Sequence, residues 1–343
     1  GRFESLQATS LEDGEIAFFQ DEDPNDPQPR KLRTRFFRDS SRTIVTENDS
    51  PDIPFRYSMN CYRGCEHGCA YCYARPTHEY LGLSAGLDFE SKIFVKEKAP
   101  ELLRERLLSP RWRPECIMMS GITDCYQPAE RKFELTRRCL EVLAEFRNPV
   151  GLITKNYLVT RDIDLLQEMA GQDLALVYLS VTTLDAELGR SLEPRTSSPS
   201  ARLQAIEALA KAGVPVGVNV APVIPGLTDH EMPKILQAAK DAGAKFADYV
   251  PLRLPYSVST IFGEWLEANR PEAASKVLSQ IREMRGGKLN EKDFHARMRG
   301  QGPRAENMRK MFDLFTARAG LNQDAFSLRT DLFRRPGDQM TLF

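Results

Sequence analysis

Short, nearly continuous apolar runs alternate with amphipathic helical patterns along most of the chain. Continuous apolar runs, rather than strictly alternating ones, are typical of parallel strands that are buried on both faces. We predict six such strands, at residues 55–59, 116–120, 150–154, 174–181, 214–220 and 247–252. Helical patterns separate them, at residues 98–108, 131–147, 161–170, 200–212 and 229–242. This order predicts an α/β fold, either a doubly wound sheet or, as we favour, a partial (β/α)6 barrel of the TIM type.

The pattern changes on both sides of this region. Residues 1–50 lack a steady period and include DEDPNDPQP at 21–29, so we predict a mostly disordered or irregular N-terminal arm. The partial barrel is predicted to occupy residues 51–255. Residues 256–343 are predicted to form a helical C-terminal extension, with amphipathic helices at 257–267, 271–284 and 303–319.

Composition and charge narrow the classes of protein. A chain of 343 residues that is 41% hydrophobic can bury a large core. No uncharged apolar stretch approaches the length of a membrane span, and the polar N-terminus lacks a signal-peptide pattern, so we expect a cytoplasmic protein without membrane contacts. The net charge of −1 gives no overall attraction to nucleic acid, although residues 280–335 carry 13 basic against 7 acidic residues. This basic tail is either a solvated helix surface or a contact for a polyanion.

Four of the seven cysteines fall within twelve residues, at Cys61, Cys65, Cys69 and Cys72. A disulfide cluster is disfavoured in a chain of this size without an export signal. Zinc sites usually take two close pairs of ligands that are separated by a dozen or more residues, whereas here one loop holds every clustered thiol, with Cys61 available as a fourth ligand. Three thiolates on one loop suit an iron–sulfur cubane better, because one iron is then left open for a substrate or cofactor.

The cysteine loop follows the first predicted strand. Parallel strands of a barrel all end on the same edge, where the active sites of this architecture lie. We therefore expect the loop to share that edge with polar residues that follow the later strands, namely Asp124, Cys125, Lys155, Thr182 and Asn219.

The cysteine spacing C-x3-C-x2-C, with an aromatic residue before the third cysteine, resembles the radical S-adenosylmethionine (SAM) superfamily. Five longer strings are similar to a bacterial branch of it that is related to spore photoproduct lyase: YRGCEHGCAYCYARPTHEYLGL, TDCYQPAER, LSVTTLD, EPRTSSPSARLQAI and APVIPGLTDHE. The resemblance implies a [4Fe-4S] cluster on Cys65, Cys69 and Cys72 and SAM on the open iron. It also implies a reducing partner such as flavodoxin or ferredoxin, and a 5′-deoxyadenosyl radical that takes a hydrogen atom from a substrate.

The resemblance further assigns contacts to SAM. Tyr71 is expected near the adenine, and Tyr73 follows the last cluster ligand as in the lyase. The other expected contacts are Thr123 and Asp124 for the amino group, Lys155 and Ser180 as polar contacts, and Glu193 with Arg195, whose guanidinium is expected to hold the carboxylate. The structural alternatives are a helix cap for Asp124, a surface position for Lys155, and a mutual Glu193–Arg195 salt bridge.

Cys61 and Cys125 stand where this branch more often has proline. Cys125 lies near the region in which the lyase carries a hydrogen-donating cysteine, so one hypothesis makes it the radical quencher or hydrogen donor. The alternatives are a Cys61–Cys125 redox pair and an inert substitution.

Three hypotheses for the function remain open. The lyase resemblance and the basic tail favour repair or modification of nucleic acid. The alternatives are modification of a protein or metabolite by the same radical chemistry, and a non-catalytic barrel whose iron–sulfur or zinc site serves structure or sensing.

Overall fold

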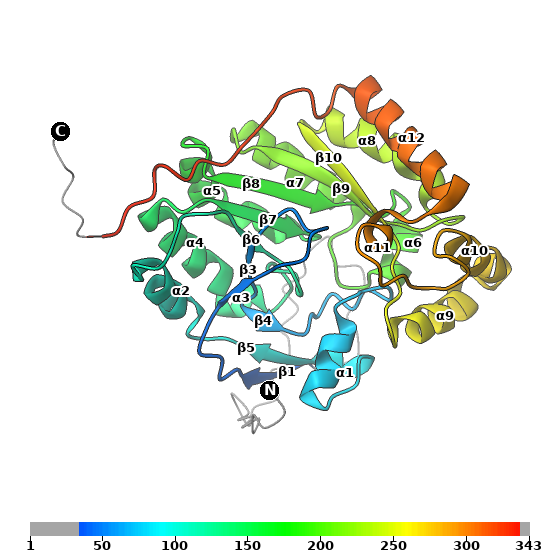
Figure 1. Ribbon diagram of the computed structural model, residues 1–343, viewed down its shortest axis with the longest axis horizontal. Coiled ribbons are helices and arrows are strands. Elements are labelled where there is room, and N and C mark those ends of the chain that lie inside the picture. Colours follow the sequence, from blue (N-terminus) through cyan, green and yellow to red (C-terminus); the bar gives the residue numbers. More distant parts are fainter. Residues whose placement is uncertain (1–33, 337–343) are drawn as a thin grey trace.

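A central sheet of seven strands organises the protein, in the order β10–β9–β8–β7–β6–β3–β2 (Figure 1). The computed structural model describes residues 34–336. The strands from β3 to β10 are parallel, and β2 pairs antiparallel with β3. Their bounds are β2 Val45–Glu47, β3 Tyr57–Met59, β6 Ile117–Met119, β7 Val150–Thr154, β8 Ala175–Ser180, β9 Val216–Val223 and β10 Phe246–Pro251. Because β10 and β2 are the two ends of this order, the sheet is not closed, and the predicted partial barrel with its six parallel strands is confirmed.

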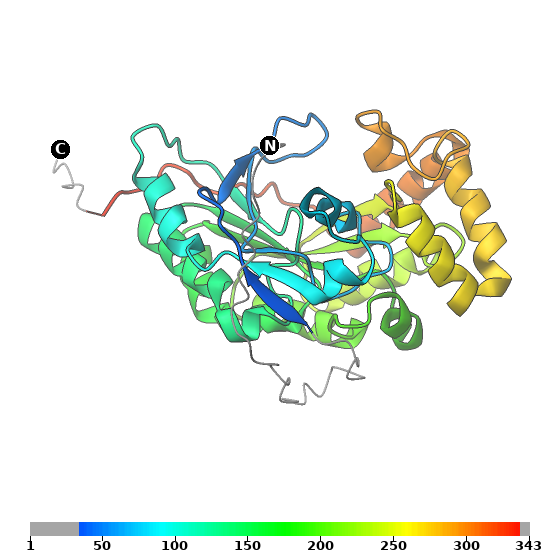
Figure 2. The ribbon, with the colours of Figure 1, turned by 90° about the horizontal axis from the view of Figure 1, so that it is seen from below.

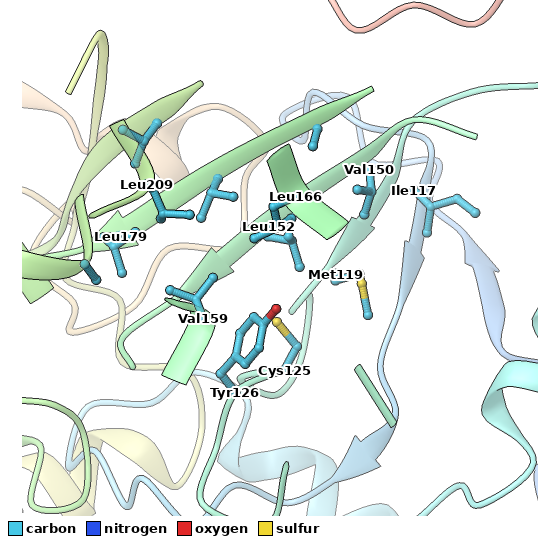
Figure 3. Packing of buried hydrophobic residues seen from close by; sticks show 14 of the residues in the cluster. Ile117, Met119, Cys125, Tyr126, Val150, Leu152, Val159, Leu166, Leu179 and Leu209 are labelled. Atoms are coloured by element: carbon cyan, nitrogen blue, oxygen red, sulfur yellow. The ribbon is translucent and has the colours of Figure 1, made fainter. Parts of the chain in front are cut away.

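Helices cover the outer face of this sheet. They are α2 Ala99–Leu108, α3 Glu130–Phe133, α4 Leu135–Phe146, α5 Ile163–Ala170, α7 Pro199–Lys211 and α8 Met232–Asp241, with the short 3-10 helices η2 Tyr157–Asp162 and η3 Asp229–Glu231 before α5 and α8. Their apolar sides form one core with the outward-facing strand residues, as Figure 3 shows for Leu166 and Leu209 beside Leu152 and Leu179. The helices expected between the strands are therefore present, with the 131–147 pattern divided into α3 and α4 by Glu134, whose φ is 49°.

The inner face of the sheet is less covered than the outer face. In β8, Ala175, Val177 and Leu179 are buried in the main core, whereas Leu176 and Tyr178 are only partly buried. Side chains of a strand point alternately to opposite faces, so these two residues lie on the inner face. Gly217 of β9 lies beside Tyr178, where an added Cβ atom would come within 2.4 Å of the tyrosine ring.

Short strands at the N-terminal side differ from the expected irregular arm. β1 Arg35–Arg38 pairs parallel with β5 Lys92–Val95, and β4 Tyr62–Arg63 pairs antiparallel with β5, which gives a second, three-stranded sheet. Together with β2, this makes residues 34–50 part of the folded unit. The segment 21–29, predicted to be disordered, lies outside the described residues. The strands were not predicted because runs of two to four residues are too short to show a clear period.

The C-terminal extension is helical as expected, with α9 Val258–Asn269, α10 Pro271–Glu283, α11 Ala296–Arg299 and α12 Gly302–Ala319. Figures 1 and 2 show α9 and α10 beyond the β10 side of the sheet. α12 packs on the sheet itself, since the rings of Phe312 and Tyr249 lie 4.6 Å apart. After α12 the chain returns along the starts of the strands, where Arg329 N–H bonds to the Asp173 carbonyl and Arg334 N–H to the Phe146 carbonyl, each at 2.9 Å.

Candidate active site

The three cysteines of the C-x3-C-x2-C motif lie in one loop that follows β3 and β4. Cys65 and Cys69 are buried, with 6% and 7% of their surface exposed, and Cys72 is half-buried. Gly64 starts the loop with φ of +82°, and a Cβ atom there would come within 2.8 Å of the Phe89 carbonyl oxygen. This close approach lets the Cys65 N–H donate to that same carbonyl at 2.9 Å. The backbone therefore fixes the direction of the first thiol.

Arg75 holds the loop from behind, in η1 Arg75–Leu81. Its guanidinium donates to the carbonyl oxygens of Gly68 at 3.0 Å and Cys69 at 2.9 Å, both within the loop. It also donates to the carbonyls of Ala85 and Gly86 and pairs with Glu90 at 2.9 Å, in the short helix α1 Leu87–Ser91. Arg75 is 1% exposed, so these bonds are shielded from water. Sequence reasoning missed this residue, whose only signal was its place three residues after the last cysteine.

The thiols form an electrostatic group. Burial raises the pKa of Cys65 well above its usual value, and the neighbouring Asp124 and the other two thiols raise it further. Burial raises the pKa of Cys69 to about 12, with Glu193 and Cys72 adding to the effect. Metal binding must therefore displace these protons. Within residues 34–336, no three His, Cys, Asp or Glu side chains are grouped as ligands of a single metal ion. The loop fits a cluster, in which each thiolate binds a different iron.

Asp124 joins the cysteine loop to the end of β7. Its Oδ2 lies 3.4 Å from Nδ1 of His67, a loop residue, and accepts the Lys155 N–H at 2.8 Å. Its Oδ1 accepts the Thr154 hydroxyl at 2.7 Å and the Tyr126 N–H at 2.9 Å. Burial alone would raise the pKa of Asp124, but His67 and these hydrogen bonds lower it to about 2. The carboxylate is thus ionised and accepts hydrogen bonds from the protein. One of these, from the Tyr126 N–H two residues further on, is the local backbone contact expected of a capping residue.

Tyr71 belongs to a buried network with Glu193. Its hydroxyl donates to Glu193 and lies 3.2 Å from the Thr182 hydroxyl, which also donates to Glu193 at 2.7 Å. The Lys155 Nζ lies 5.9 Å from the centre of the Tyr71 ring. Tyr71 and Lys155, which sequence reasoning assigned to SAM, therefore lie together beside Cys69 in this network.

Glu193 pairs with Arg202, not with Arg195. Arg202 is 1% exposed and also donates to the carbonyls of Ser180 at 3.0 Å and Ser197 at 2.8 Å. Burial alone would raise the pKa of Glu193, but Arg202 and Lys155 hold it below its usual value. The alternative of a mutual Glu193–Arg195 bridge is therefore wrong. Arg202 was missed, although it lies within the quoted string EPRTSSPSARLQAI.

Arg195 faces the other side of the cysteine loop. Its Nη1 lies 3.8 Å from the buried carboxylate of Glu66 and 3.3 Å from the Thr34 hydroxyl, and its backbone N–H donates to the His67 carbonyl at 3.2 Å. Burial raises the pKa of Glu66. The 193–197 loop is therefore tied to the cysteine loop on two sides, by Tyr71 and by Arg195.

Thr123 follows β6, and Tyr73 of the cysteine loop contacts the same segment. The Tyr73 hydroxyl donates to the Gly121 carbonyl at 2.7 Å, and its side chain is 51% exposed. The Thr123 N–H donates to the Asn60 side chain at 3.1 Å. Ser180 is buried near the end of β8, in register with Asn219 of β9. These residues share the C-terminal edge of the sheet with the cysteine loop.

Cys125 has a buried position, and the hydrogen-donor role expected of it stays a prediction. It is 2% exposed and packs in the main core, where Figure 3 shows it beside Tyr126. Cys61 also fails to pair with it, because the Cys61 sulfur contacts the Cys139 sulfur at 3.8 Å. The proposed Cys61–Cys125 pair is therefore replaced by a Cys61–Cys139 contact between free thiols.

A partial parallel barrel with a three-cysteine loop at the C-terminal edge of its strands defines a class of cluster-binding enzymes. The family model of the radical SAM superfamily matches residues 59–239, and the chain belongs to this superfamily. Members of this superfamily are enzymes that use SAM and an iron–sulfur cluster.

The chain is also similar to curated relatives and to solved structures. An uncharacterised protein of Mycobacterium tuberculosis is 40% identical over 65% of this chain, and the match spans only 66% of that relative's length. An uncharacterised protein of Methanocaldococcus jannaschii is 29% identical over 64% of this chain and 78% of its own. Spore photoproduct lyase complexed with dinucleoside spore photoproduct has the same fold, with a TM-score of 0.57 at 14% identity over 83% of this chain and 80% of the lyase. None of the helices in residues 34–336 is long and apolar enough to cross a bilayer.

Proposed function

We propose that this enzyme binds a [4Fe-4S] cluster through Cys65, Cys69 and Cys72 and uses it to cleave SAM reductively. The observation that carries the proposal is the single loop of three clustered thiols, held by Arg75 at the C-terminal edge of the parallel strands. When bound, the cluster and SAM supply a 5′-deoxyadenosyl radical, which abstracts a hydrogen atom from the substrate. The electron comes from a reducing partner such as flavodoxin or ferredoxin.

The protein's own residues orient these groups. Tyr71 and Lys155 lie beside Cys69 and offer a ring face and a cation to the adenine and the carboxylate of SAM. Arg202 keeps Glu193 ionised and thereby fixes the Tyr71 hydroxyl. Asp124 and His67 tie the loop to β7, so they position the site through the backbone of Lys155. The apolar sides of α9 and α10 pack against Cys69 and Tyr71 and keep water from this side of the loop.

The proposed substrate is nucleic acid. The lyase that shares this fold was solved with a dinucleoside photoproduct, and at 14% identity this likeness supports the fold alone. Independent support comes from two exposed aromatic residues in the segment after β10, each with a basic side chain over its ring. The Lys292 Nζ lies 6.0 Å from the centre of the Tyr256 ring, and the Arg297 guanidinium lies 4.8 Å from that of Phe294. Aromatic rings among basic side chains are the usual means of binding unpaired bases.

The test is anaerobic reconstitution with iron and sulfide, followed by dithionite and SAM. We expect about four irons per chain, as the cubane requires, together with 5′-deoxyadenosine among the products. The nucleoside should disappear in Cys69→Ala. The matched control is Cys116→Ala, which removes a thiol outside the loop and should leave nucleoside formation intact. Iron incorporation without any nucleoside in the unmodified protein, with and without single-stranded DNA, would contradict the proposal.

A further inference from the structure

Arg253 is a charged side chain without an ionic partner beside the candidate site. Arg253 follows β10 by two residues, and its guanidinium lies 5.6 Å from the centre of the Tyr73 ring. Tyr73 itself directly follows Cys72, the last cysteine of the loop. Among residues 34–336, its Nη1 contacts the Met298 sulfur, at 2.8 Å. Its Nε is buried without any hydrogen-bond partner. No carboxylate in residues 34–336 forms an ion pair with it.

Two neighbouring arginines show what a satisfied guanidinium looks like here. Arg285 donates to four carbonyl oxygens, those of Pro251, Leu252, Ala296 and Arg297, at 2.8–3.3 Å. Arg297 forms a two-pronged pair with Asp52, with both distances at 2.7 Å, and so ties the segment before β3 to α11. Arg253 has neither kind of partner, so packing within the folded chain does not explain its charge.

The surroundings of Arg253 are electropositive. Burial lowers its pKa, and Arg297 lowers it further, while Tyr73 and Asp52 oppose this change. Burial also lowers the pKa of Arg285, to about 10, and the charge of Arg253 contributes. Asp52 is paired with Arg297, and Glu291 acts on Arg285 only through its field, so an anion at Arg253 would relieve the repulsion among the three guanidinium groups.

We propose that Arg253 binds a phosphate of the substrate and holds it beside Tyr73 and the cysteine loop. This inference deepens the proposed function and rests on it, because it assigns the substrate to single-stranded nucleic acid. A guanidinium presents several donors in a plane and suits a phosphate better than a point charge does. The partner groups now present, a thioether and a ring face, are weak ones that a phosphate oxygen can displace or complement.

The positive character continues along the chain beyond Met298. Arg299, which also pairs with Asp248 at 3.1 Å, lines a surface hollow of about 430 Å³ together with Arg309, Glu306 and the first residues of α12. The first turn of that 18-residue helix has no side-chain cap, so its N–H groups favour an anion at the same place. A second phosphate of one strand can therefore follow the first, which favours a polynucleotide over a small phosphorylated metabolite.

The test measures binding of a fluorescein-labelled single-stranded oligothymidylate to the reconstituted full chain by fluorescence anisotropy. Arg253→Gln should weaken binding by about tenfold, the loss expected for a charged hydrogen-bond partner. It should also reduce the slope of log affinity against log salt by about 0.7, the value of one phosphate contact on a single strand. Arg253→Lys should keep that slope, because the charge remains. The matched control is Arg318→Gln, an exposed arginine at the far end of α12, which should change neither quantity.

Each other outcome overturns the proposal. Equal affinity and equal salt slope in Arg253→Gln and Arg318→Gln would show that no phosphate binds at Arg253. If Arg253→Gln bound SAM more weakly and the oligonucleotide as tightly as the unmodified protein does, Arg253 would be a contact of the cofactor and not of the substrate. Absence of oligonucleotide binding by the unmodified protein at low salt would refute the substrate class. The formation of 5′-deoxyadenosine without substrate, measured in parallel, would then leave the radical SAM function standing. An unchanged thermal unfolding profile of Arg253→Gln confirms that the variant folds.

Discussion

Arg75 offers the sharpest test of how the cysteine loop is held. Arg75→Met keeps the length and the apolar stem of the side chain and removes its five polar contacts. Two of those contacts are carbonyls of the cysteine loop, and one is the buried carboxylate of Glu90, which is 5% exposed. Removing one partner of a buried ion pair typically costs about 3–5 kcal/mol, because the other charge loses its partner in a poorly solvated place.

The control is an arginine–glutamate pair of similar geometry at the surface. Arg104 and Glu145 form a two-pronged pair, with side chains 41% and 39% exposed. Exposed pairs contribute about 0–1 kcal/mol, so Arg104→Met should cost little. Arg75→Lys should fall between the two, because it retains the charge near Glu90 and loses the fork that reaches four carbonyls.

Two measurements separate folding from cluster binding. Urea denaturation of the apoprotein gives the change in the free energy of unfolding, expected at about 3–5 kcal/mol for Arg75→Met. The number of irons per chain after reconstitution reports whether the loop still holds its thiols in place to bind the cluster. We expect Arg75→Met to bind less iron than the unmodified protein. If Arg75→Met matches Arg104→Met in both stability and iron content, the loop is not held by Arg75 and the reasoning is refuted.

Three further outcomes are expected. Arg202→Met should destabilise the apoprotein by about 3–5 kcal/mol, and adding Glu193→Gln should recover part of the loss in urea denaturation; a double variant no more stable than the single one would contradict the pairing. Arg297 holds the pKa of Asp52 well below its usual 3.8, so this pair stabilises the fold above about pH 4 and the contribution is lost as pH falls through the folded-state pKa. Asp52→Asn should therefore lower stability at neutral pH and flatten the loss of stability below pH 4, measured by thermal unfolding at several pH values. Cys125→Ala should cost about 1 kcal/mol as a small core truncation and still form 5′-deoxyadenosine, whereas loss of the nucleoside without loss of stability would restore the thiol to catalysis.

The repeating units of the fold could be predicted because each buried strand is a continuous apolar run. β7 was predicted to the residue, and the ends of the other five parallel strands were within about two or three residues, the usual reliability of such boundaries. The short strands β1, β4 and β5 could not be found in this way. Their pairing brings together residues more than thirty positions apart, and nothing in the local sequence records it.

The site was predictable only where covalent spacing defines it. The C-x3-C-x2-C spacing places three thiols on one loop in any fold, so the candidate ligands followed from sequence. The partners of Glu193 and Cys61 did not, because Arg202 and Cys139 reach them through the packing of helices onto the sheet. Cys125 shows the same limit: its position at the end of β6 was predicted, but the direction of its side chain, into the core, depends on the turn that follows.

The segment that follows α12 has a consequence for biosynthesis. It crosses the starts of the strands, where Asn322 bonds to both Lys245 and Ala247, and Arg329 and Arg334 bond to the chain just before β8 and β7. Every one of these partners is synthesised long before residues 321–335 leave the ribosome. The base of the nascent barrel therefore stays uncovered until residues 321–335 have emerged, while its cysteine loop and Arg75 are already outside. The cysteine loop is thus synthesised and can fold before the segment that covers the strand starts is in place.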